Sequence, residues 1–328
     1  MKTDDQIFAN QHFVPQFYLR LFSDDKKTIS LFNKFYKQKV DKKYINDIAA
    51  IKGLYDFEYS EHKLTSELET RLGTFERKAA PLIKKYIAKP ADFINMPDSE
   101  KVTLSRFFGA QYVRTLKFRK FQENRFDFAM KQGIALAEAE KKGTDAETEI
   151  QNMMDMPIFF MNHSQATLQE MMSRAKMVKQ ALYNRNWTLV ETKHDTFITS
   201  DSPMARIIYK DGSDEFMIAL GPKLVLMMEL QRRPSSFFTE NTDPFAVMDV
   251  FQKAYKYNEI MCKQSYFEIY GQSGLIDDVI ARYQPKFSKA GIRFTDFYDE
   301  NIELHEKNFP VDVFSNSDNQ YYRRLYGR

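Results

Sequence analysis

Cysteine is almost absent from this sequence, because its 328 residues contain only Cys262. A single thiol excludes an internal disulfide framework and a cysteine-rich zinc site. Long apolar runs are also missing, since no uninterrupted stretch approaches the roughly 18 residues that suggest a membrane span. The N-terminal segment lacks the continuous apolar core of an export signal. These absences favour a location in a reducing cytoplasm and no membrane partner.

Charge of one sign is not in excess, because 48 basic residues stand against 45 acidic ones and the net charge is +3. The overall balance therefore gives no strong evidence for a nucleic-acid partner. The distribution is uneven, however, and residues 114–125 mix five basic side chains with aromatic ones, which suits phosphate contact and base stacking. We expect Arg119, Lys120 and Arg125 to contact a DNA backbone, although a solvated helix face has the same composition.

The chain does contain many apolar residues, 43% of the total, and their spacing changes along the sequence. Alternation predicts strands at 27–35, at 53–60 and repeatedly over 186–231, whereas 41–52 reads as a loop with a short helical turn. Spacings of three and four predict helices over four ranges: 63–89, 96–132, 163–185 and 243–271. This order favours an α+β fold with a small, mostly antiparallel sheet, long helices and an N-terminal hairpin that joins later strands. Without repeats or a linker, we expect one domain over 1–328.

Familiar catalytic signatures are missing as well. The sequence has no glycine-rich phosphate loop, no Cys-x-x-Cys and no His-Glu-x-x-His, and its five histidines are not spaced as a local metal pair. These absences argue against a histidine-based zinc enzyme. We therefore expect neither a cofactor nor a bound metal.

Three polar stretches interrupt apolar surroundings. Residues 12–19, HFVPQFYL, alternate polar and apolar side chains. Residues 107–119 carry a glutamine and an arginine three positions apart, hence on one helix face. In residues 197–204, FITSDSPM, an apolar strand ends in an aspartate that a following proline holds in place. Because buried polar groups need partners, we expect these stretches to meet in one cleft lined by His12, Gln111, Arg114 and Asp201.

Together these stretches resemble an uncharacterised bacterial domain family of unknown function, marked by an N-terminal His-x-x-Pro-x-x-Tyr-Leu motif. Here that motif consists of His12, Pro15, Tyr18 and Leu19. The resemblance extends through Lys34, Glu69, Glu76, an Ala-Gln-x-x-Arg-Thr stretch at 110–115, a Thr-Ser-Asp-x-Pro stretch at 199–203, a strand at 220–228 and Asn258. It covers about residues 11–270, departs from the family only in a leucine at 116 where proline is more usual, and leaves 271–328 as a C-terminal extension.

The resemblance implies a bacterial accessory protein that acts against phage, with excision of a DNA base as its suspected activity. Cleavage of an N-glycosidic bond passes through an oxocarbenium-like state, which needs a nearby carboxylate and a polar, aromatic pocket for the extruded base. The candidate catalytic residues are Asp201, Glu76 and His12. The candidate substrate-binding residues are Gln16, Tyr18, Lys34, Gln111 and Arg114. We therefore expect a DNA glycosylase whose partner is DNA, including hypermodified phage DNA.

Two other functions stay open at this point. If residues 187–193 form a strand, Glu191 and Lys193 share a face and make half of a metal-dependent nuclease site, which Asp201 on the next strand would complete. In that architecture the aspartate normally precedes the Glu-x-Lys pair, and short matches are common. The other alternative is a non-catalytic sensor that binds nucleic acid or a phage protein through a basic face.

The polar residues also have purely structural interpretations. His12 can cap a turn, and Asp201 can brace one through an Asx-type hydrogen bond. Gln111 and Arg114 can form an internal network with a helical glutamate. The tertiary arrangement distinguishes these interpretations, because it shows which side chains meet in a cleft and which are enclosed.

Overall fold

A computed structural model of the chain describes residues 10–55, 57–60, 63–65, 67–154, 164–208, 213–230, 235–240, 242, 244–284 and 297–298. The helices are α2 (Gln16–Leu19), α3 (Glu67–Ala88), α4 (Asp98–Val113), α5 (Leu116–Lys142), α6 (Ala146–Met154), α7 (Ser164–Tyr183), α8 (Pro244–Gln264) and α9 (Ser273–Tyr283). Short 3-10 turns are η1 (Arg20–Phe22), η2 (Ile45–Asp47) and η3 (Pro90–Asn95). None of the described helices is long and apolar enough to cross a bilayer.

The described strands form two larger sheets and two small pairs. In chain order they are β1 (Asn10–His12), β2 (Thr28–Asn33), β3 (Gln38–Tyr44), β4 (Ala50–Lys52), β5 (Phe57–Ser60), β6 (Lys63–Thr65), β7 (Asn186–Glu191), β8 (Thr199–Ser200), β9 (Met204–Ile208), β10 (Asp214–Gly221), β11 (Leu224–Glu229), β12 (Ser236–Thr239), β13 (Glu268–Gly271) and β14 (Phe297–Tyr298). The sheet orders are β12-β7-β11-β10-β9-β14, β3-β2-β13-β8, β1-β4 and β5-β6.

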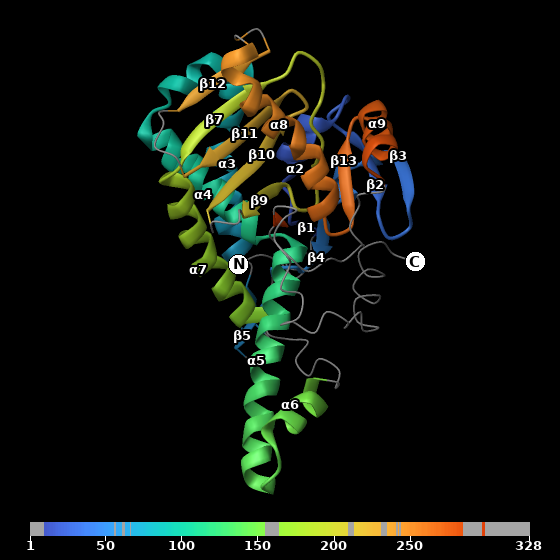
Figure 1. The fold of residues 1–328 in the computed structure, drawn as a ribbon, viewed down its shortest axis with the longest axis vertical. Coiled ribbons are helices and arrows are strands. Elements are labelled where there is room, and N and C mark those ends of the chain that lie inside the picture. Colours follow the sequence, from blue (N-terminus) through green and yellow to red (C-terminus); the bar gives the residue numbers. More distant parts are fainter. Residues whose placement is uncertain are drawn as a thin grey trace.

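These sheets confirm the predicted α+β class. The described strand pairs are antiparallel except β12–β7 and β14–β9, which are parallel. Figure 1 shows α3 and α4 behind the six-stranded sheet and α8 crossing in front, while α5 extends away from both sheets with α6 beside its far end. An N-terminal hairpin does join a late strand, because β2 pairs with β13 in the four-stranded sheet. Its second strand is β3, however, whereas the strand expected at 53–60 lies in a separate pair, β5-β6.

Four strands contradict the sequence-based prediction, among them β4 in the range read as a loop and β6 at the start of the predicted helix 63–89. Strand β3 begins at Gln38 and runs into 41–52, the range read as a loop; six of its seven residues are exposed, so it shows no apolar alternation. Its pairing with β2 makes it a strand at the edge of the sheet. Strand β13 lies where the predicted helix 243–271 was expected to end, because α8 stops at Gln264. Its four buried residues are too few to show a period of their own.

The predicted helix 96–132 is in fact two helices that meet at Arg114 and Thr115. Thr115 adopts an extended conformation, with φ −69° and ψ 153°, and its side chain accepts a hydrogen bond from the Phe118 N–H. A threonine in this position caps the start of a new helix. Arg114 therefore sits at the buried corner between α4 and α5. By contrast, α3 continues as one helix through Pro81.

Close packing joins α4 to α7. A Cβ atom added to Gly109 would lie 2.8 Å from both the Ala175 carbonyl oxygen and the Lys179 backbone nitrogen. Both neighbouring atoms belong to the backbone of α7 and cannot rotate away. Glycine at this position therefore sets the separation of the two helices, and α4 is held firmly where it carries Arg114 at its end.

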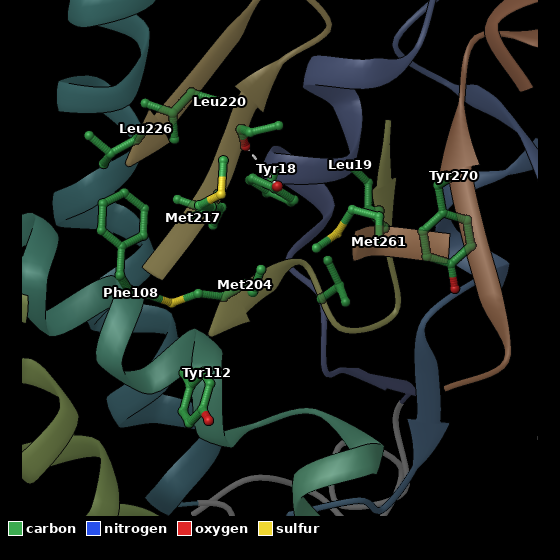
Figure 2. Close-up of a cluster of buried hydrophobic side chains, with 14 of the residues drawn as sticks. Tyr18, Leu19, Phe108, Tyr112, Met204, Met217, Leu220, Leu226, Met261 and Tyr270 are labelled. Carbon is green, nitrogen blue, oxygen red and sulfur yellow. Dashed lines mark hydrogen bonds between the residues drawn. The ribbon is translucent and has the colours of Figure 1, made fainter. Parts of the chain in front are cut away.

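Tyr18 attaches the N-terminal segment to both larger sheets. Its side chain is fully buried, and its hydroxyl donates to the Ala219 carbonyl oxygen at 2.8 Å and lies 3.1 Å from Thr199 Oγ1. Figure 2 shows it between Met217 and Leu220 of β10 and Met261 of α8. Burial raises the pKa of the Tyr18 phenol well above its ordinary value. This anchor fixes where α2 lies.

Candidate functional site

A cleft of about 520 Å³ opens between the N-terminal segment and α3. Its main polar and aromatic lining residues are His12, Gln16, Phe17, Arg20, Tyr55, Glu69, Glu76 and Arg114. A second hollow of about 500 Å³ shares Phe17, Gly73 and Glu76 with it and continues to Arg77. The two hollows follow one face of α3.

Arg114 and Glu76 form an ion pair inside the cleft. The Arg114 Nη1 atom lies 2.6 Å from Glu76 Oε1, and the two side chains are 5% and 25% exposed. Arg114 also donates from Nη2 to the His12 carbonyl oxygen and from Nε to the Tyr55 hydroxyl at 3.4 Å. Although burial opposes its charge, Tyr55 and Glu76 raise the pKa of Arg114. The guanidinium is thus fixed from three directions and orients a carboxylate that remains accessible from the cleft.

A second carboxylate lies on the same helix. Glu69 precedes Glu76 by seven residues, which is two helical turns or roughly 10 Å along the axis, so both face the cleft. Gln11 donates from Nε2 to Glu69 Oε2 at 3.3 Å and accepts the Tyr55 N–H through Oε1 at 2.5 Å. The cleft therefore presents two oriented carboxylates on one wall.

The opposite wall carries a hydrogen-bonded chain that links β1, α2 and η1. Arg20 Nη2 donates to Gln16 Oε1 at 2.6 Å, and Gln16 Nε2 lies 3.4 Å from His12 Nε2. Because a guanidinium can only donate, it turns the amide oxygen toward Arg20 and the NH₂ group toward His12. This amide orientation fits a ring whose Nε2 accepts and whose proton is on Nδ1.

The Ile45 carbonyl oxygen also lies 3.4 Å from His12 Nε2, but a ring that donated to it could not accept from Gln16. Burial, with a further contribution from the Arg114 charge, lowers the pKa of His12 below its ordinary value of 6.5. The ring is therefore neutral at pH 7. The Gln16 amide occupies the Nε2 lone pair, so the neutral ring can accept a proton there when that hydrogen bond is released.

The structure brings together only part of the predicted site. His12, Gln16, Glu76 and Arg114 line the cleft. Gln111, Tyr18, Lys34 and Asp201 are buried elsewhere, with Gln111 fully enclosed and donating to the Phe13 carbonyl oxygen at 3.0 Å. Of the four residues expected to line one cleft, His12 and Arg114 do so, and Gln111 and Asp201 do not.

Asp201 has a structural position that does not suit the predicted catalytic role. Its side chain is 3% exposed, and its two oxygens accept the backbone N–H groups of Tyr266, Phe267 and Glu268 at 2.8, 2.5 and 3.1 Å. Burial raises the pKa of its carboxyl, with the three N–H groups and nearby Lys34 acting in the opposite direction. The carboxylate therefore holds the chain that enters β13.

Lys34 supports the same region and does not reach the cleft. Its ammonium group donates to the Ser265 carbonyl oxygen at 2.6 Å and to the Cys262 carbonyl oxygen at 3.3 Å. Burial lowers the pKa of Lys34 to about 8. This enclosure does not suit the predicted contact with a substrate.

The predicted DNA-backbone residues do not share one exposed face. Arg119 is 9% exposed and donates through Nη1 to the Leu54 carbonyl oxygen, so it is not placed to contact phosphate. Lys120 is half-buried. The side chain of Arg125 lies outside the part that the structure describes. An exposed basic helix face is therefore not evident among the described residues of 114–125.

The alternative nuclease site lacks its third member. Glu191 ends β7 and Lys193 is exposed beyond it, but both Asp201 oxygens are taken up by backbone N–H groups. Within the described residues, no three His, Cys, Asp or Glu side chains are grouped so that they could hold a metal ion. The observed geometry gives this alternative no support.

Arg20 and Tyr55 are two of the cleft residues that sequence reasoning missed. Arg20 lies four residues after Gln16, a spacing that places both on one face of a helical segment, and this signal could have identified it. Tyr55 lies beneath Arg114, with its hydroxyl also donating to the Arg114 carbonyl oxygen at 3.3 Å. Nothing in its local sequence indicates that contact.

Fold and cleft together define an α+β protein with a polar cleft that holds two carboxylates, a neutral histidine and an ion-paired arginine. A model of DUF4238, a family of proteins of unknown function, matches residues 10–274 and so includes every residue that lines the cleft. The chain belongs to this family. No curated protein and no solved structure matches it.

Proposed function

We propose that the protein is a DNA glycosylase that hydrolyses an N-glycosidic bond in the cleft, with Glu76 as the catalytic carboxylate. The observation that carries the proposal is the 2.6 Å pair between Arg114 and Glu76, which orients a carboxylate toward an open space beside neutral His12. In keeping with the family resemblance, we assign the enzyme to the bacterial cytoplasm and to defence against phage DNA.

Each group has a chemical role in this proposal. As the bond between base and sugar breaks, positive charge develops on the sugar, and the Glu76 carboxylate stabilises it. The base leaves with the bonding electrons and takes up a proton from bulk water. Water adds to the anomeric carbon and gives a proton to His12 or Glu76, which returns it to bulk water. Phe17, half-buried and 5.5 Å from the Phe107 ring centroid, is a wall against which the base packs.

The products distinguish this activity from its alternatives. We expect base release to persist in excess EDTA and to leave abasic sites, which break only after alkali or an abasic-site lyase. The substrates should include hypermodified phage DNA, because host DNA must be spared. Direct strand cleavage that EDTA stops would support the nuclease instead. Intact DNA binding without covalent change in any substrate would support the sensor.

Gly73 provides a test of the cleft that leaves its polar groups intact. No heavy atom lies within 4 Å of a Cβ built at Gly73, which lines the cleft in the interior of α3. Gly73→Ala should raise the free energy of unfolding by about 0.5 to 1 kcal/mol, since glycine is unfavourable inside helices. Gly73→Leu should project into the cleft and reduce base release at least tenfold, as measured by alkali-labile sites.

The matched control is Gly133→Leu in α5, where a Cβ also meets no heavy atom within 4 Å. This variant should keep full activity, because Gly133 does not line the cleft. Equal activity of the two leucine variants would show that the reaction occurs elsewhere.

A further inference from the structure

Arg20 differs from the other arginine that lines the main cleft. Arg114 is paired with Glu76 and is 5% exposed, whereas Arg20 is half-buried and, among the residues that the structure describes, bonds only to the neutral amide of Gln16. Within the described part of the chain, no carboxylate pairs with Arg20. A guanidinium has five N–H donors and keeps its charge at any ordinary pH, so most of its binding capacity faces the cleft unused.

The chemistry of this position suits a phosphate group. The planar fork of a guanidinium matches the oxygens of phosphate and can bind two of them at once. The wall opposite carries Glu69 and Glu76, which repel an anion. The favourable position for an anionic group is therefore beside Arg20. The uncharged sugar attached to that group would then lie on the side of the cleft that carries Glu76.

We propose that Arg20 binds a phosphate of the DNA backbone next to the nucleotide whose base is removed. This inference rests on the proposed function, because it fixes the orientation of the same substrate in the same cleft. It also assigns a role to the hydrogen bonds that link Arg20, Gln16 and His12. A phosphate that draws Arg20 away from Gln16 changes the hydrogen bond that the Gln16 amide makes to His12 Nε2. The environment of the His12 ring therefore depends on whether the phosphate is bound.

The probe is a DNA duplex with a central tetrahydrofuran abasic analogue, which cannot react and has no base at the site. Arg20→Gln should weaken its binding by about tenfold to a hundredfold, the usual range for one charge-assisted hydrogen bond. Arg20→Lys keeps the positive charge but lacks the planar guanidinium, so its affinity for the duplex should lie between those of the unmodified chain and Arg20→Gln. The slope of log affinity against log salt should become shallower by about one in Arg20→Gln.

The matched control is Arg282→Gln in α9, an exposed arginine outside the cleft, which should bind as the unmodified chain does. NMR signals of the His12 ring, assigned with His12→Asn, provide a second readout. The duplex should shift them in the unmodified chain and not in Arg20→Gln. A shift with inorganic phosphate but not with DNA would assign the same site to the phosphate of a free nucleotide.

Failure of this inference is distinguishable from failure of the proposed function. If no DNA releases a base but Arg20→Gln still weakens duplex binding, the phosphate site stands and the glycosylase activity is wrong. If the unmodified chain releases a base and Arg20→Gln binds the duplex equally well with the same salt slope, the phosphate site is wrong. Absence of any response to both duplex and inorganic phosphate would also overturn it.

Discussion

Replacing Glu76 by glutamine should lower the rate of base release by about a hundredfold to a thousandfold, the usual effect of removing one electrostatic group aimed at a transition state. Glutamine keeps the shape of the side chain and an oxygen that accepts from Arg114 Nη1. It removes the negative charge that would stabilise an oxocarbenium-like sugar. Single-turnover measurement of alkali-labile sites, with enzyme in excess over DNA, would report this step without interference from product release.

Two further glutamine variants control the result. Glu67→Gln, on the exposed side of α3, removes the charge of a surface pair with Arg71 and should be fully active, because Glu67 does not line the cleft. Glu69→Gln removes the other carboxylate of the cleft, so it shows which carboxylate the reaction needs. Activity of Glu76→Gln close to that of the unmodified chain, with Glu69→Gln inactive, would transfer the catalytic role to Glu69. Duplex binding and circular dichroism would establish that each variant is folded.

Replacing Asp201 by alanine should lower the free energy of unfolding by about 3 to 5 kcal/mol. The change leaves three buried N–H groups, those of residues 266–268, without their acceptor and deprives the Lys34 ammonium of its nearby negative charge. Each unsatisfied donor costs about 1 to 3 kcal/mol. Since domains are stable by only about 5 to 15 kcal/mol, urea unfolding should shift strongly toward lower concentration.

The control for this prediction is Asp195→Ala, because Asp195 is exposed in the connection before β8. It should change stability by no more than about 0.5 kcal/mol. Asp201→Asn keeps one acceptor oxygen, so its loss of unfolding free energy should lie between those of Asp195→Ala and Asp201→Ala. If Asp201→Asn unfolded like the unmodified chain yet lost base release, Asp201 would have a catalytic role after all, contrary to its enclosure.

Long periodic segments explain why much of the fold was predictable. The apolar spacing over 63–89 anticipated α3, which spans Glu67–Ala88, and the range 163–185 anticipated α7 in the same way. Strands β3 and β13 were missed because their residues are nearly all exposed or all buried, so neither alternates. Pairing with β2 makes both of them strands, and such pairing between distant segments leaves no local periodicity.

By itself, the sequence determined the α+β class and drew attention to polar residues that interrupt apolar elements. The tertiary structure decided which of these polar residues line the cleft and which are enclosed. An enclosed polar group with partners and a polar group lining a cleft give the same local pattern, because both stand among apolar neighbours. The break at Thr115 turned Arg114 toward His12 and Glu76, whereas the approach of residues 266–268 enclosed Asp201. Contacts between segments that are distant in the sequence distinguish the enclosed residue from the cleft residue, and the local sequence does not encode those contacts.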